Sequence, residues 1–72
     1  DIFSRGNTVL IKNTSDASGV VRIFDMIGQL RHTTALKGNS LTEIKTALAP
    51  AIYIVRVTAT GIDQSEKIII HH

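Results

Sequence analysis

β-Branched residues restrict the fold of this chain more than any other feature. Eleven Ile, five Val and eight Thr make up a third of its 72 residues. Their branched side chains favour the extended backbone and pleated surface of a β-sheet. Because short runs of these residues alternate with turn-forming residues, the sequence predicts an all-β fold.

Gly, Pro, Asn and Asp interrupt the apolar runs at short intervals, as turns between strands do. The segments between these turns predict strands at residues 8–12, 20–26, 29–36, 41–46, 51–59 and 65–71, with a further short strand near Ile2. No segment is long enough for the helical crossovers of a parallel sheet. Six or seven short strands therefore predict two packed antiparallel sheets.

Alternation along these segments predicts which side chains face the core, because successive strand residues point to opposite faces. Segment 51–59 carries apolar residues on both faces, which is typical of a strand in the middle of a sheet. The predicted core face comprises Val21, Ile23, Tyr53, Val55, Val57, Ile68 and Ile70.

One segment also fits a helix. Residues 40–43 match a helix capping box, and Leu41, Ile44 and Leu48 have helical spacing. Pro50 would end such a helix after about three turns at most, a length that is marginal without tertiary packing. The residues alone leave strand and helix open here.

Length and composition limit the function. A chain of 72 residues holds one hydrophobic core, so residues 1–72 are expected to form a single domain. Because it starts at Asp1 with neither Met nor a leader, we expect it to be a module of a longer polypeptide. It has no cysteine, and its eight basic residues are scattered singly, which argues against nucleic acid as a partner. Its longest apolar runs are far shorter than the roughly 20 residues of a membrane helix.

The polar residues do not form a recognisable catalytic site. Ser40, Ser65, His32, Asp25 and Asp63 occur without a nucleophile elbow, a phosphate-binding loop or a pair of acids. We expect them at solvated strand and turn positions. The sequence therefore predicts neither an enzyme nor a cofactor.

The end of the chain combines a charge with an apolar run. Lys67 precedes Ile68–Ile70 and serves either recognition or protection of an apolar strand from aggregation. The adjacent His71 and His72 would point to opposite faces of a strand, which disfavours a shared metal ion. The pair also fits the start of an affinity tag, in which case the native chain ends near Ile70.

Three segments in order carry a family resemblance: VVRIFDMIGQL (20–30), LAPAIYIVRV (48–57) and SEKIII (65–70). The chain resembles the C-terminal sorting domain of type IX secretion substrates. Residues at the positions of the family motif are Asp25, Gly28, Leu48, Tyr53, Val55, Val57, Gly61 and Lys67. Two features differ, since Ala51 replaces a family glycine and a Pro-Asn-Pro segment is missing.

The resemblance implies a small immunoglobulin-like sandwich, which favours strand over helix for residues 41–46. It also implies a non-catalytic signal that an outer-membrane translocon of a Gram-negative bacterium reads once the cargo, N-terminal to the domain, has folded in the periplasm. A sortase-like surface protease often removes such domains, near or before Asp1 here, and the cargo stays at the cell surface or is secreted. The alternative is an immunoglobulin-like adhesion or spacer module of a surface enzyme.

The last strand is the candidate for recognition, because an edge strand offers unpaired backbone groups and alternating side chains to a partner. The residues expected to contact the translocon are Arg56, Gly61, Ile62, Asp63, Gln64, Lys67 and Ile69, with residues 61–64 forming a hairpin turn. An exposed edge would also give an excised domain a route to a dimer.

Overall fold

The computed structural model of the chain describes residues 2–71 and contains strands without helices over this range. Asp1 and His72 lie outside the described residues, so the tag interpretation of His72 lies outside them too. The strands are β1 (Ile2–Arg5), β2 (Thr8–Asn13), β3 (Gly19–Phe24), β4 (Leu30–Leu36), β5 (Ser40–Lys45), β6 (Ala51–Ala59) and β7 (Ile62–Ile70). No membrane-spanning helix is found in the described part. The prediction of an all-β fold is confirmed.

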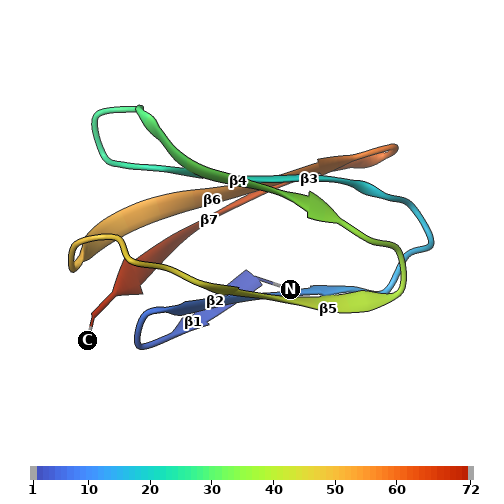
Figure 1. Cartoon of the computed structure of the whole chain (residues 1–72). Coiled ribbons are helices and arrows are strands. Elements are labelled where there is room, and N and C mark those ends of the chain that lie inside the picture. Colours follow the sequence, from blue (N-terminus) through green and yellow to red (C-terminus); the bar gives the residue numbers. More distant parts are fainter. Residues whose placement is uncertain (1, 72) are drawn as a thin grey trace.

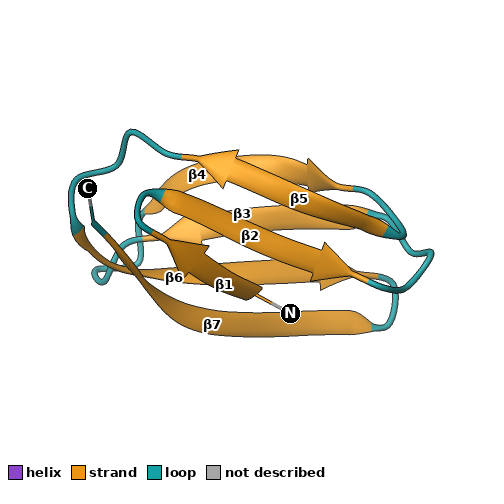
Figure 2. Ribbon diagram, turned by 90° about the horizontal axis from the view of Figure 1, so that it is seen from below, coloured by secondary structure: helices purple, strands orange, loops and turns teal. Residues whose placement is uncertain are grey.

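The strands form two antiparallel sheets that pack face to face, as in a small immunoglobulin-like sandwich (Figures 1 and 2). One sheet has the order β1-β2-β5 and the other has the order β4-β3-β6-β7. Strand β6 lies between β3 and β7, which confirms its predicted central position. Strand β7 lies at the edge of the four-stranded sheet, so one side of its backbone has no strand neighbour within that sheet.

The core lies between the two sheets. All seven residues predicted to face it are buried, and Val21, Ile23, Val55 and Ile70 are completely inaccessible to solvent. Buried residues that join them from other positions are Val9, Ile11, Leu36 and Ile44. Alternation of apolar residues predicted the buried side chains correctly, because one face of each sheet is covered by the other sheet.

The segment with helical spacing is a strand. Strand β5 pairs with β2 from Thr8↔Lys45 to Asn13↔Ser40. Its residue Ile44 is buried whereas Leu41 is 59 % exposed, as expected when the two point to opposite faces. Pairing with β2 outweighs the weak helical preference of so short a segment.

The last strand begins three residues earlier than predicted, at Ile62. The predicted turn through residues 61–64 is therefore wrong: Ala59 pairs directly with Ile62, and only Thr60 and Gly61 form the turn. Gly61 has a φ of 76°, a conformation that glycine adopts without steric cost, so two residues suffice. The polar residues that suggested a longer turn are exposed residues of an edge strand.

The two sheets meet along one seam, where β1 runs beside the second half of β7 (Figure 2). The Ser4 hydroxyl donates a hydrogen bond of 3.2 Å to the Ile69 carbonyl. The His71 N–H donates a bond of 3.1 Å to the Gly6 carbonyl. From the first contact to the second, the position advances from Ser4 to Gly6 on one side and from Ile69 to His71 on the other. Both numbers rise by two, so β1 runs parallel to β7.

Candidate recognition surface

The β6–β7 hairpin presents its outer face at the edge of the larger sheet. Its register runs from Ala59↔Ile62 at the turn to Ala51↔Ile70 at the end of β7. Because Ile68 and Ile70 point into the core, the odd-numbered residues of β7 point outward. The hairpin face is defined here as the outward side chains Ile52, Arg56, Asp63, Lys67 and Ile69, all of which are exposed.

An ion pair lies near the turn end of the hairpin face. Arg56 Nε and Nη2 donate to Asp63 Oδ1 and Oδ2 at 3.1 and 2.9 Å, a two-pronged geometry that fixes the guanidinium plane. The hydrogen bonds from Arg56, helped by its positive charge, lower the pKa of Asp63. The same contacts raise the pKa of Arg56. Both side chains are about half exposed, so the pair orients charges more than it stabilises the fold.

Arg22 of β3 lies directly opposite Arg56 in the sheet. Two like charges at such positions repel each other. The two guanidinium groups therefore bind different partners. Arg22 contacts the Thr58 hydroxyl at 3.4 Å, whereas Arg56 turns towards β7 and Asp63. Arg22 thus adds a second cation beside the hairpin face, and only the strand register reveals it.

The other end of the hairpin face is mixed apolar and basic. Ile69 is 58 % exposed and lies opposite Ile52, which is 40 % exposed. Lys67 lies opposite Ile54 and is also exposed. Ile52 was absent from the predicted contact set, because its position opposite Ile69 follows from the pairing of β6 with β7.

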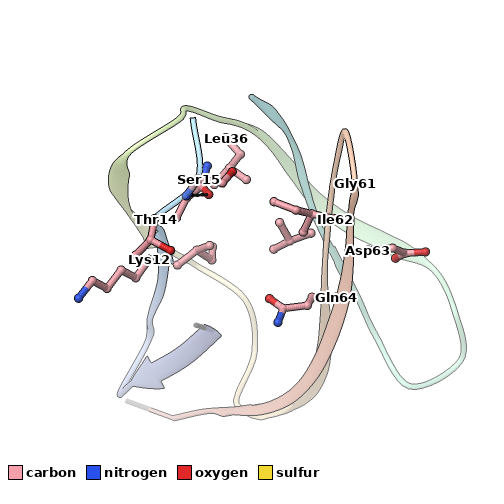
Figure 3. Close-up of a pocket in the computed structure, with 11 residues that line it drawn as sticks. Lys12, Thr14, Ser15, Leu36, Gly61, Ile62, Asp63 and Gln64 are labelled. Carbon is pink, nitrogen blue, oxygen red and sulfur yellow. Dashed lines mark hydrogen bonds between the residues drawn. The ribbon is translucent and has the colours of Figure 1, made fainter. Parts of the chain in front are cut away.

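The structure divides the predicted contact residues between two surfaces. Arg56, Asp63, Lys67 and Ile69 share the outer face, and Gly61 lies in the turn. Ile62 and Gln64 point instead to the inner side, where Figure 3 shows them beside a cleft while the Asp63 carboxylate points away from it.

The cleft separates the end of β2 from the start of β7 and has a volume of about 470 Å³. Strand β1 is short and does not extend along this part of β7 (Figure 2). The residues that line the cleft are Ile11, Lys12, Asn13, Thr14, Ser15, Leu36, Val57, Gly61, Ile62, Asp63 and Gln64.

Asp25 and Gly28 of the family motif form the tight turn predicted for them. Asp25 Oδ1 accepts hydrogen bonds from the N–H groups of Ile27 and Gln29 at 3.1 and 2.9 Å. The Gly28 N–H donates to the Asp25 carbonyl at 3.1 Å, and Gly28 has a φ of 87°. Because Asp25 begins this turn, β3 ends at Phe24, two residues earlier than predicted.

The remaining motif residues hold the core together. Val55 and Val57 are buried, and Leu48 packs against the core from the segment before β6. The ring of Tyr53 is buried, and its hydroxyl donates a 2.7 Å hydrogen bond to the Ala49 carbonyl. Ala51, which stands where the family has glycine, pairs with Ile70 in the regular ladder.

Within residues 2–71, no three His, Cys, Asp or Glu side chains lie close enough together to hold a metal ion. The buried polar side chains of the same range all have hydrogen-bond partners. The hairpin face, with its exposed ion pair, Lys67 and Ile69, is the candidate recognition surface of the described residues.

Comparison with known proteins gives one match. The family model described as "Secretion system C-terminal sorting domain" matches residues 5–71, which covers nearly the whole sandwich. No curated protein and no solved structure matches the chain.

Proposed function

This chain belongs to the family of secretion-system C-terminal sorting domains, and we propose that the type IX secretion machinery reads the outer face of its β6–β7 hairpin. The domain is the non-catalytic sorting signal of type IX secretion and directs an attached protein to the cell surface or the medium of a Gram-negative bacterium. The alternative of an adhesion or spacer module finds no support in this match.

The observation that carries the proposal is the concentration of exposed, oriented side chains on one edge hairpin. The ion pair with Asp63 holds the Arg56 guanidinium in one orientation near the turn. Lys67 and Ile69 lie further from the turn on the same face. The core residues of β6 and β7 anchor the backbone beneath them. A surface ordered before binding loses less conformational entropy in the complex.

Recognition of this kind depends on the folded domain. The hairpin face takes alternate residues from two strands, so no continuous segment of the unfolded chain presents it. A translocon that binds this face therefore distinguishes folded from unfolded substrate. This property suits a signal that is read in the periplasm after the cargo has folded.

The proposal extends to the fate of the domain. The cargo joins the domain on the N-terminal side, and a sortase-like surface protease cleaves near or before Asp1. Cleavage there leaves the sandwich intact, because the seam and the core are formed by residues that follow.

A swap of the ion pair tests the proposal. The chain is fused to the C-terminus of a folded reporter in a type IX-competent cell, and the double variant Arg56→Asp with Asp63→Arg is compared with the unaltered domain. The swap keeps a cross-strand ion pair but reverses the charge pattern, so export is expected to fall. The unfolding midpoint is expected to stay the same or rise, because Arg56→Asp also removes the repulsion from Arg22. Equal export of both fusions would exclude this face as the surface that is read.

A further inference from the structure

Strand β7 is covered unevenly along its outer edge. Strand β1 lies beside its second half, through the contacts of Ser4 with Ile69 and of Gly6 with His71. These contacts place Ile2 beside Lys67. The first half of β7 extends five residues further towards the turn, and in the described chain no strand lies along its outer edge, the side away from β6.

The backbone groups of this first half alternate in direction. In an antiparallel pair, residues alternately turn their N–H and C=O groups towards the neighbouring strand and away from it. The Ile69 carbonyl and the His71 N–H bond to β1, on the side away from β6. By the same alternation, Asp63, Ser65 and Lys67 turn their backbone groups outward. Lys67 lies beside Ile2, so the outward groups of Asp63 and Ser65 form what we call the open edge of β7.

The cleft lies next to this open edge. Apolar Ile11, Leu36 and Val57 contribute to its lining, together with polar Asn13 from β2 and polar Gln64 from β7 of the other sheet. Gln64 and Glu66 are exposed although they point to the same side as the buried Ile68. The inner side of β7 is therefore uncovered at Gln64 and Glu66. A strand that continued β1 upstream of Ile2 would cover it.

We infer that the open edge of β7 and the cleft bind the polypeptide segment that joins the cargo to Ile2, as a strand that continues β1 parallel to β7. The inference rests on the proposed function, because a C-terminal sorting signal follows its cargo. The position of β1 favours this occupant. Strand β1 already lies along β7, and the chain upstream of Ile2 would enter the cleft if it kept the direction of β1.

The register gives the docked segment a defined chemistry. The second residue upstream of Ile2 lies beside Ser65, and the fourth lies beside Asp63, because the offset between β1 and β7 is constant. Ile2 packs against the core, so alternation turns these two upstream residues inward as well. Apolar side chains at the two positions would fill the cleft.

Amide hydrogen exchange tests the inference without any secretion. It is measured by NMR on the 72-residue chain and on the same chain extended by its ten native upstream residues. In the extended chain the amides of Asp63 and Ser65 are expected to exchange about tenfold more slowly, because each gains a hydrogen bond to an upstream residue. The outer-edge amides of β4, on the opposite side of the same sheet, serve as the control and are expected to stay unchanged.

Two substitutions in the extended chain separate docking from general stability. Ser65→Pro removes an N–H that points away from β6, which an edge strand tolerates, and is expected to abolish the added protection of Asp63. Ser65→Ala keeps the N–H and is expected to retain this protection. Equal protection of Asp63 in both variants would overturn the inference.

The remaining outcomes distinguish other occupants. Unchanged exchange in the extended chain would overturn the inference, and so would protection that rises with protein concentration, because a second copy would then occupy the edge. If exchange is unchanged but the domain still exports a reporter, the docking fails and the proposed function stands. If docking occurs but variants of the hairpin face export normally, the proposed function fails instead.

Discussion

The two halves of β7 share one backbone geometry but have different surroundings. In the covered half, Ile68 and Ile70 are 5 % and 0 % exposed, whereas Gln64 and Glu66 in the open half point to the same side and are exposed. The difference arises because β1 has only four residues and runs beside the second half alone (Figure 2).

This comparison shows how one strand combines anchoring with display. Apolar burial in the covered half holds β7 against the core, and the ladder with β6 carries that order into the open half. The open half can then carry polar residues without losing its strand conformation. A signal domain of this size uses few residues for both tasks.

The sharpest test of the comparison is truncation of one inward side chain in each half. Ile70→Ala leaves a cavity in the core and is expected to lower the free energy of unfolding by about 3–4 kcal/mol. Gln64→Ala is expected to change it by less than about 0.5 kcal/mol. Urea unfolding followed by circular dichroism measures both, and similar losses would show that the two halves are equally buried.

A smaller effect is expected at the turn that begins the open half. Gly61→Ala forces alanine into a left-handed conformation and is expected to cost about 1 kcal/mol. An added Cβ would meet nothing within 4 Å, so the cost comes from the backbone alone. Gly28→Ala is the matched control, because Gly28 has the same freedom in a distant turn. Only Gly61→Ala should speed amide exchange in the first residues of β7.

The seam that protects the covered half is expected to contribute less. Ser4→Ala removes the bond to the Ile69 carbonyl and is expected to cost about 0.5 kcal/mol, because the bond is exposed to water. The His71 amide should then exchange faster. Ser40→Ala removes a similar exposed bond to Lys37 and should leave the His71 amide unaffected. Equal effects of the two variants would contradict the role of the seam.

The smallest effect concerns the ion pair of the open half. Because Arg56 lowers the pKa of Asp63, the pair stabilises the fold above the ordinary pKa of Asp and loses this contribution as pH falls through the lowered value. NMR titration should place the Asp63 midpoint below the ordinary range, and Arg56→Gln should return it there. An ordinary midpoint in the unaltered domain would show that the pair does not persist in solution.

Residue patterns predicted the interior better than the surface. Tyr53, Val55 and Val57 alternate in a β-branched segment, so their burial followed from the period of a strand. The start of β7 was missed because Asp63 and Gln64 are as typical of turns as of exposed strands. Ile52 was missed because only the pairing of β6 with β7 places it opposite Ile69. The family resemblance, rather than any local pattern, indicated the function.

Export of a reporter tests the central claim, that the machinery reads the hairpin face. The double variant Lys67→Glu with Ile69→Asp is compared with Lys45→Glu with Leu41→Asp on β5 of the other sheet. Ile69 and Leu41 are 58 % and 59 % exposed, so the two variants change matched surfaces. The first is expected to lower export about tenfold, equivalent to ~1.4 kcal/mol of binding, while both keep the same unfolding midpoint and the second exports normally. Equal export from the two variants would contradict the account.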